Sequence, residues 1–318
     1  MKNTIIPVFF TIDNAFAPYL SVALASAIEN SDPSRRYRAI ILHEDLTEET
    51  MNKLSSLAKE HFEITFERIE GRLDMIENKV GHMLNCSHFT LTIYYRLLIP
   101  NMFPEYDKGI YIDSDVVVPG DLAELFDQDI EDNLIGACAD TSVLEIPEFT
   151  TYMEEAVGVS RFEYVNSGVL LMNLKALREC GFEQHFFRLL TTYSFDLVAP
   201  DQDYLNAICN GRIYYLSPVW DAMPNENHSA LDEPKLVHYN LFYKPWRYDG
   251  IQYGDLFWKY AEQTPYYEYL RDFKAAYGDE NKSRDGECLR MLIGQAVKLT
   301  NAETTFRKVS EKGECVRL

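Results

Sequence analysis

Short apolar runs alternate with helix-spaced apolar residues along the first two thirds of the chain. Runs of about four to eight apolar residues between turn residues predict strands, and apolar residues about three or four positions apart predict helices. The expected strands are Ile5–Ile12, Tyr37–Leu42, Phe62–Ile69, Gly109–Val118, Leu134–Ala139, Val165–Asn173, Ile213–Leu216 and Lys235–Tyr239. The expected helices are Pro18–Glu29, Thr47–Glu60, Thr92–Leu98, Leu122–Phe126, Phe182–Tyr193 and Gln202–Ile208.

Strands that alternate with helices predict an α/β fold with a mainly parallel sheet flanked by helices. Residues 70–90 carry little pattern and predict a loop or a lid. From residue 251 onwards the composition becomes aromatic and helical, so we expect one large domain over residues 1–250 and a helical extension over residues 251–318. Residues 281–318 hold eight Lys or Arg against five Asp or Glu. The apolar positions of this tail, Leu289, Leu292, Ile293 and Val297, predict a helix packed on its own domain, with peripheral contact to an acidic membrane as the alternative.

The composition excludes some classes of function. A net charge of −20 opposes nucleic-acid binding, which requires a basic surface. Six cysteines without a C-x-x-C pair predict free thiols in a reducing compartment. Asp13 and Asn14 interrupt the apolar N-terminal run, so we expect no cleaved signal peptide. Because we also see no apolar run of membrane-spanning length, we expect a cytoplasmic protein, with at most peripheral contact at the inner face of the membrane.

Two carboxylates carry the first sign of chemistry. Asp113 and Asp115 follow the apolar start of one strand, and side chains at i and i+2 of an extended strand leave the same face. Two buried like charges repel unless a cation lies between them, and a divalent metal fits that position. His238 and Lys244 follow a later strand, where an imidazole would complete a mixed nitrogen and oxygen set that suits Mn²⁺ better than Mg²⁺. Each of these residues also has an ordinary structural interpretation when it is taken alone.

The order of several motifs carries a resemblance to a known family. The motifs are Asp13 after the first strand, Tyr94-Tyr-Arg-Leu97, Tyr111-Ile-Asp-Ser-Asp115, Asn166-Ser-Gly-Val-Leu-Leu-Met-Asn-Leu174, Asp201-Gln-Asp203, and His238 with Lys244-Pro-Trp246. Over roughly residues 4–248 the chain resembles the family 8 glycosyltransferases. These are retaining enzymes with a GT-A fold, and they include bacterial lipopolysaccharide galactosyl- and glucosyltransferases.

The resemblance implies a role for each matching residue. It implies that Asp113, Asp115 and His238 bind Mn²⁺, or Mg²⁺ as the alternative, and that the metal bridges the phosphates of a UDP-sugar. Gln202, beside the anomeric carbon, and Asp201, a carboxylate within reach, are the implied catalytic residues. The other implied donor contacts are Thr11 and Asp13 near the uracil, Ser114 beside the metal ligands, Arg96 near the diphosphate and sugar, Asn166 and Asp201 at the sugar hydroxyls, and Lys244 at a phosphate.

The chemistry of the implied catalytic residues favours one mechanism. An amide such as Gln202 is a poor nucleophile, which favours attack by the acceptor on the same face as the leaving group. The carboxylate of Asp201 keeps a covalent intermediate open as the alternative. Two departures from the family concern the donor: Ala15 stands where relatives carry an asparagine that contacts the ribose, and Leu241 where some relatives carry a glycine against the phosphates.

The expected function is therefore a hexosyltransferase that moves glucose or galactose from a UDP-sugar to a cell-surface glycan or a lipid-linked acceptor. No residue decides between glucose and galactose, and the oligomeric state stays open. One alternative is a metal-dependent phosphotransferase or phosphatase, although Val116-Val-Val118 stands where such enzymes usually have a Thr or a Gly-rich turn. The other alternative is a nucleotide-sugar-binding protein without catalysis.

Overall fold

The computed structural model describes residues 4–69 and 91–318, so the loop or lid expected at residues 70–90 lies outside the described residues. Its main sheet has seven strands in the order β3-β2-β1-β4-β7-β6-β8. The strands are β1 Ile5–Thr11, β2 Arg36–His43, β3 Phe62–Arg68, β4 Gly109–Ile112, β6 Ile135–Ala137, β7 Val169–Met172 and β8 Ile213–Tyr215. All neighbouring pairs are parallel except those of β7, which is antiparallel to both β4 and β6. The predicted α/β class with a mainly parallel sheet is confirmed.

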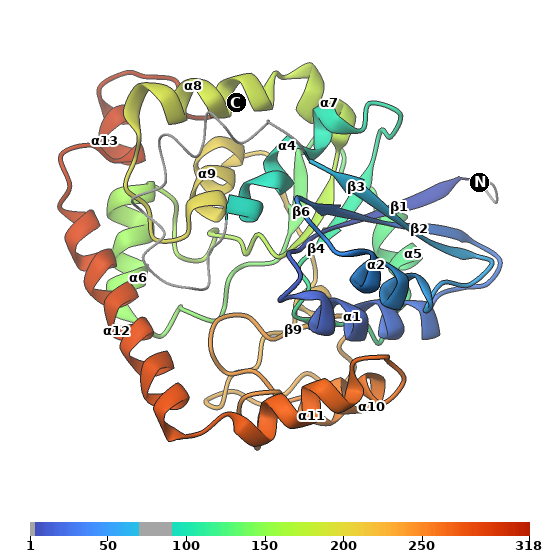
Figure 1. Ribbon diagram of the computed structural model, residues 1–318. Helices are drawn as coiled ribbons and strands as arrows, with labels where there is room; N and C mark the ends of the chain where they lie inside the picture. Colours follow the sequence, from blue (N-terminus) through green and yellow to red (C-terminus); the bar gives the residue numbers. More distant parts are fainter. Residues whose placement is uncertain (1–3, 70–90) are drawn as a thin grey trace.

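Helices cover both faces of this sheet (Figure 1). Strand β1 shows why: Val8 and Phe10 pack with the cluster that contains Leu20 of α1, whereas Phe9 packs with the opposite cluster. Alternate side chains of a strand that is buried on both faces must each meet an apolar layer. The helices are α1 Ala17–Glu29, α2 Glu48–Ser55, α4 Tyr95–Met102, α5 Leu122–Phe126, α6 Pro147–Tyr152, α7 Leu174–Glu179, α8 Phe182–Tyr193, α9 Pro200–Cys209, α10 Gly254–Ala261, α11 Tyr267–Ala276, α12 Asp279–Thr300 and α13 Phe306–Glu311, with 3₁₀ turns η1 Leu91–Tyr94 and η3 Pro218–Trp220 and a π-helical turn η2 Met153–Val157.

The strand predicted over Gly109–Val118 is wrong as a single strand. Strand β4 ends at Ile112, the chain bends at Ser114 and Asp115, and β5 (Val116–Val117) leaves the main sheet. β5 instead pairs antiparallel with β9 (Val237–His238). An apolar run alone does not show that the chain changes sheets within it. Asp113 and Asp115 therefore lie in a bend, and their common direction does not come from the i, i+2 geometry of one strand.

The other differences between the predicted and the observed elements are smaller. β7 begins at Val169, so the predicted strand Val165–Asn173 is shorter and Asn166 lies in the segment before it. Helix α2 ends at Ser55 rather than near Glu60, while its predicted start is confirmed, because the Thr47 hydroxyl accepts from the Thr50 amide. The short helices α6 and α7 lacked enough periodicity to be predicted.

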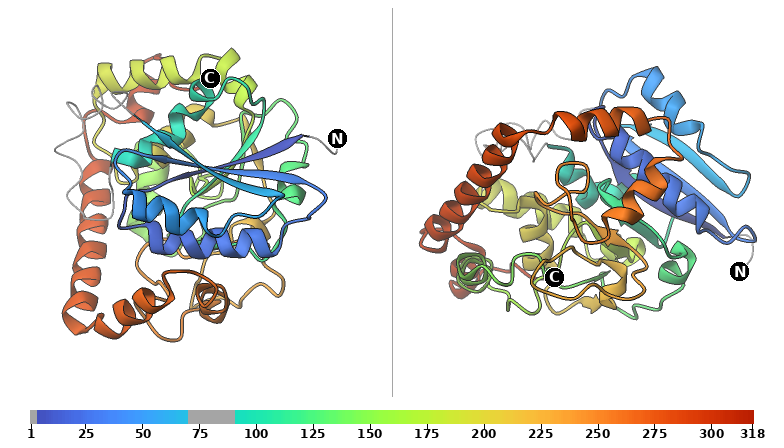
Figure 2. Two further views of the ribbon diagram at one scale, coloured as in Figure 1. Left: turned by 45° about the vertical axis from the view of Figure 1, so that its right-hand side comes forward. Right: turned by 90° about the horizontal axis from the view of Figure 1, so that it is seen from below.

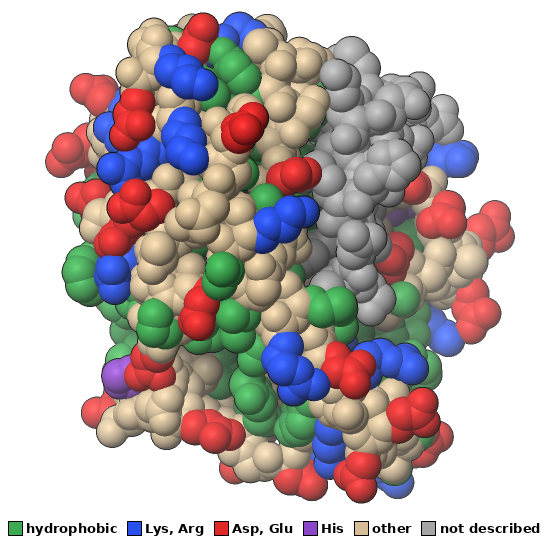
Figure 3. Space-filling view, turned by 90° about the vertical axis from the view of Figure 1, so that its left-hand side faces the viewer, with side chains coloured by type: hydrophobic (Ala, Val, Ile, Leu, Met, Phe, Trp, Pro, Cys, Tyr) green, Lys and Arg blue, Asp and Glu red, His purple; other side chains and the backbone are tan. Residues whose placement is uncertain are grey.

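The C-terminal helices pack on two sides of the large domain (Figure 2). Helices α10 and α11 lie against α1, where Tyr19 and Trp246 stack at 4.4 Å between ring centroids. Helix α12 packs on α6 and buries Leu292, which confirms the amphipathic helix, although Val297 is 49% exposed and lies outside its buried stripe. The outer face of this side mixes positive and negative side chains (Figure 3). The division at residue 250 stays a prediction.

Two further observations concern the cysteines and the length of the helices. The five cysteines that the structure describes are free thiols. Among the residues described, none of the helices combines the length and the apolar character needed to cross a lipid bilayer.

Candidate active site

The topology brings distant motifs to one edge of the sheet. The chain passes from β3 to β4 on the other side of β1, so the carboxyl ends of β1 and β4 flank a switch point, where α/β proteins bind ligands. Because β7 runs antiparallel, its beginning also lies at this edge, and the Asp113 amide donates to the Gly168 carbonyl at 2.8 Å. All the predicted site residues line a single cavity there.

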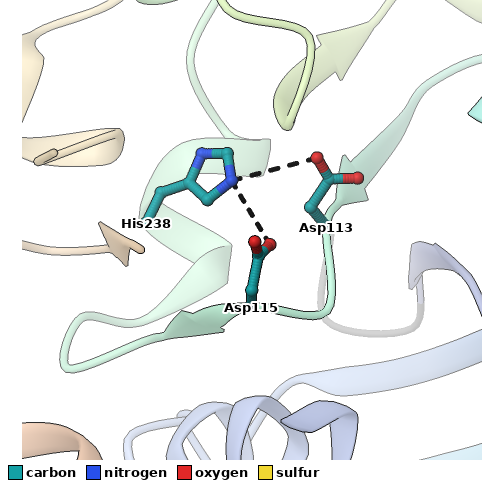
Figure 4. Close-up of side chains that lie close together, drawn as sticks. All are labelled: Asp113, Asp115 and His238. Atoms are coloured by element: carbon teal, nitrogen blue, oxygen red, sulfur yellow. Dashed lines mark ion pairs between the residues drawn. The ribbon is translucent and has the colours of Figure 1, made fainter. Parts of the chain in front are cut away.

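Asp113, Asp115 and His238 form the candidate metal centre of this cavity (Figure 4). His238 Nε2 lies 3.3 Å from Asp115 Oδ1 and 3.9 Å from Asp113 Oδ2. One ligand atom from each residue lies within 4.8 Å of the others. Ligand atoms on opposite sides of a divalent metal are roughly 4 Å apart. Small side-chain rotations would therefore let all three atoms reach a metal ion placed between them. The donor set therefore fits a divalent cation.

A further carboxylate, Asp221, orients the imidazole. Its Oδ1 lies 3.1 Å from His238 Nδ1, so the imidazole can donate from Nδ1 and present Nε2 to the two aspartates. Burial alone would lower the pKa of His238, but Asp115 and Asp221 raise it to about 10. The cause is the negative potential of the buried carboxylates, which favours positive charge at this point.

We expect Asp221→Asn to weaken Mn²⁺ binding by about 10- to 100-fold, because a carboxylate behind a metal-binding histidine fixes its tautomer and raises its basicity. Isothermal titration of the purified protein with MnCl₂ measures the effect. Asp132→Asn makes the same chemical change at an exposed position and should leave the affinity unchanged. Equal affinities in both variants would mean that Asp221 only fills space beside His238.

Gly168 has no side chain, which leaves room for His238 and Asp113 of the candidate metal centre. A Cβ at this position would lie 2.3 Å from His238 Cε1 and 2.7 Å from Asp113 Oδ2. Both distances are shorter than any van der Waals contact, so a larger residue would displace one of the candidate ligands. The glycine of the Asn166-Ser-Gly motif is therefore required by the close approach of two distant segments.

Arg96 connects the candidate metal centre to Asp201 on another side of the cavity. It is 4% exposed, and its guanidinium contacts Asp113 at 2.8 Å and Asp201 at 3.0 Å. Burial alone would lower the pKa of Arg96, but these two carboxylates raise it further above its usual range. Asp201 also accepts from the Ser167 hydroxyl at 2.9 Å. Arg96 is therefore a buried residue, and Asp201 does not cap α9, whose N-cap is Ala199.

Asp140 holds the two predicted amides. Its Oδ2 accepts from Asn166 Nδ2 at 3.1 Å and from Gln202 Nε2 at 2.9 Å. The carbonyl oxygen of Gln202 accepts from the Ser167 amide at 3.0 Å. Both ends of the Gln202 side chain are thus fixed by hydrogen bonds, which orients this amide before any substrate arrives.

The remaining predicted residues lie around the same cavity. Lys244 Nζ contacts Asp115 Oδ2 at 2.5 Å. Burial alone would raise the pKa of Asp115, but the positive charges of Lys244 and His238 keep it well below its usual range. Thr11 is linked to Asp113 through the Tyr111 hydroxyl, at 2.7 and 2.8 Å. Ser114 is buried beside these groups. Asp13 Oδ1 accepts from the Ala15 and Phe16 amides and so shapes the turn into α1.

The sequence interpretation missed Asp140 and Asp221. Asp140 had a usable signal, because it closely follows β6 on the edge where the other ligands were expected. Asp221 had none, since it follows a 3₁₀ turn far from any motif. Leu241 gains a structural meaning: its φ of 54° lies in the left-handed region that favours glycine, the residue that the family resemblance suggests as an alternative at this position.

Comparison with known proteins identifies the family. The family model described as Glycosyl transferase family 8 matches residues 7–250. The chain belongs to this family. A lipopolysaccharide 1,2-glucosyltransferase of Escherichia coli is 26% identical over 259 residues, covering 76% of this chain and 73% of that protein. General stress protein A of Bacillus subtilis is 24% identical over 283 residues, covering 83% of this chain and 95% of that protein.

Solved structures share the fold of this family 8 chain. The galactosyltransferase LgtC, determined with donor and acceptor sugar analogues, superposes with a TM-score of 0.68 at 23% identity, covering 88% of this chain and 100% of that one. The fold is that of the GT-A glycosyltransferases. The chain spans 64% of the length of a Haemophilus influenzae relative and 52% of the bifunctional glycosyltransferase WbbM.

Proposed function

We propose that this family 8 glycosyltransferase moves glucose or galactose from a UDP-sugar to a cell-surface glycan or lipid-linked acceptor, with retention of the anomeric configuration and with Mn²⁺ as its metal. The observation that carries the proposal is that the candidate metal centre and the fixed amide of Gln202 line the same cavity. We also propose a cytoplasmic location, with peripheral contact to the inner face of the membrane through residues 281–318 at most. The free thiols agree with a reducing compartment.

The metal end of the cavity suits a diphosphate leaving group. Asp113, Asp115 and His238 would hold the metal, which supplies positive charge to the phosphates when bound. Lys244 lies beside Asp115 and adds a second cation on the same side. Thr11, Asp13 and Ser114 line the part of the cavity next to this centre, where we place the nucleoside. Cations fixed where negative charge develops are typically the largest catalytic contribution.

The sugar end suits attack on the same face. Arg96, Asn166 and Asp201 would hold the sugar, and Gln202 would lie behind its anomeric carbon. Asp201 is already paired with Arg96 and Ser167, and Gln202 is held by Asp140, so neither side chain is poised as a free nucleophile. In the step that we propose, the bond from the anomeric carbon to the UDP oxygen breaks and the acceptor oxygen bonds to that carbon. The hydroxyl proton passes to the departing phosphate oxygen.

A panel of UDP-, GDP- and CDP-sugars tests this proposal through nucleotide release. We expect release of UDP from UDP-glucose or UDP-galactose with Mn²⁺, and loss of release when EDTA removes the metal. Turnover of another nucleotide class, without any UDP-sugar, would overturn the proposal. Hydrolysis of p-nitrophenyl phosphate would favour the phosphatase instead, and UDP-sugar binding without UDP release would favour the non-catalytic binding protein.

A further inference from the structure

The cavity has two ends of different chemistry. Its nucleotide end carries the aromatic residues Phe16, Tyr19 and Trp246, which pack with the C-terminal helices α10 and α11. Its far wall is apolar and belongs to a different hydrophobic cluster. We call this side the apolar wall; its residues include Val143, Phe149, Met153, Val198 and Leu292.

The apolar wall is built from elements that hold one another in place. Phe149 lies on α6, Met153 begins the π-helical turn η2, and Leu292 comes from α12, which packs on α6. From α12, Gln295 Nε2 donates to the Leu197 carbonyl at 2.7 Å, which fixes the loop that carries Val198. Single π-helical turns occur frequently at functional sites. The wall is therefore a packed surface.

Its position places the apolar wall on the acceptor side. Val143 closely follows Asp140, and Val198 closely precedes Asp201, so the wall adjoins the polar groups that we assign to the transferred sugar. A UDP-hexose has no apolar group for this wall, since its phosphates and hydroxyls are polar and its uracil belongs at the opposite end. Burying sugar hydroxyls against apolar side chains without hydrogen-bond partners is unfavourable. The wall thus fits neither the donor nor an unsubstituted acceptor sugar.

We infer that the apolar wall binds an aliphatic chain attached to the acceptor sugar, so that the acceptor is a glycolipid rather than a free oligosaccharide. The inference rests on the proposed function for the identity of the neighbouring donor site. Methionine side chains adapt to flexible aliphatic partners, and Met153 lines this wall together with the half-buried Val143 and Val198.

Matched glycosides test the chain requirement. Methyl and octyl β-glucosides and β-galactosides, kept below the concentration at which octyl glycosides form micelles, are titrated calorimetrically into the protein with UDP and MnCl₂. We expect the octyl glycoside to bind at least about tenfold more tightly than the methyl glycoside. Burial of only two methylene groups of the octyl chain would already give a gain of this size. Equal affinity of the methyl and octyl compounds, or no measurable octyl binding, would overturn the inference.

Two variants locate the chain. Val143→Ser and Leu292→Ser should each reduce the octyl advantage by about three- to tenfold, the loss expected for one or two buried methylenes. Val297→Ser is the matched control, because Val297 is 49% exposed on the same helix as Leu292. Melting temperatures show which variants fold, and the half-buried Val143 keeps the test available if Leu292→Ser unfolds. An unchanged octyl advantage in folded variants would place the chain elsewhere and overturn the inference.

Enzymatic turnover separates this inference from the proposed function. If UDP is released at equal rates with methyl and octyl acceptors, the protein is still a glycosyltransferase, but the apolar wall is not an acceptor subsite. If the octyl glycoside binds more tightly than the methyl glycoside but no UDP-sugar is turned over, the apolar wall is a binding subsite and the proposed UDP-sugar donor is wrong.

Discussion

Asp115→Asn is expected to lower kcat/KM for hexose transfer by on the order of a thousandfold, about 4 kcal/mol of transition-state stabilisation. Asp115 contacts both His238 and Lys244, so the change removes a metal ligand and leaves the buried Lys244 cation without its carboxylate. The UDP-release assay with Mn²⁺ measures the loss, and Mn²⁺ titration should show weakened binding in parallel.

Two measurements make the Asp115 result interpretable. Breaking a buried ion pair also destabilises a protein, so the melting temperature of the variant must lie well above the assay temperature. Asp132→Asn, at an exposed position, should retain the parent activity. A folded Asp115→Asn protein with the parent kcat/KM would remove Asp115 from the proposed metal centre.

Gly168→Ala is expected to abolish Mn²⁺ binding at concentrations that saturate the parent, with a loss of about 100-fold or more, because the added methyl group collides with His238 and Asp113. The backbone cannot easily retreat. The Gly168 carbonyl accepts from the Asp113 amide, and the Gly168 amide donates to Asn166 Oδ1 at 2.8 Å. Calorimetric titration with MnCl₂ and the UDP-release assay should lose signal together.

Gly294 provides the matched control for this substitution. It lies in helix α12, and a Cβ there would meet no heavy atom within 4 Å. Gly294→Ala should keep Mn²⁺ affinity and raise stability by up to about 1 kcal/mol, because alanine favours the helix. Parent-like metal binding in Gly168→Ala would show that the site does not need His238 and Asp113 where they lie.

Much of the fold was predictable because local patterns determine it. The apolar run Ile5–Ile12 marked β1 to within one residue, and Phe182–Tyr193 has the bounds predicted for α8. The division of Gly109–Val118 was not predictable from its residues, since the pairing of β5 with β9 depends on a segment far along the chain. The same dependence explains why β7 was not recognised as antiparallel.

The candidate site divides in a similar way. Residues in motifs, such as Asp113, His238 and Gln202, were found because their order along the chain is distinctive. Asp140 and Asp221 act through other side chains, and a contact between side chains from distant segments leaves no local pattern. Each became visible only through its distance to Gln202 or His238.

The short pairing of β5 with β9 has a consequence for how long the folded chain survives. It joins the Asp113–Asp115 segment to His238, so a metal bound there would form a reversible cross-link between two segments that are distant in the sequence. A ligand that binds only the folded state stabilises it, by about 2.7 kcal/mol at a hundred times its dissociation constant. The supply of such a metal would then change the resistance of the folded chain to unfolding and proteolysis.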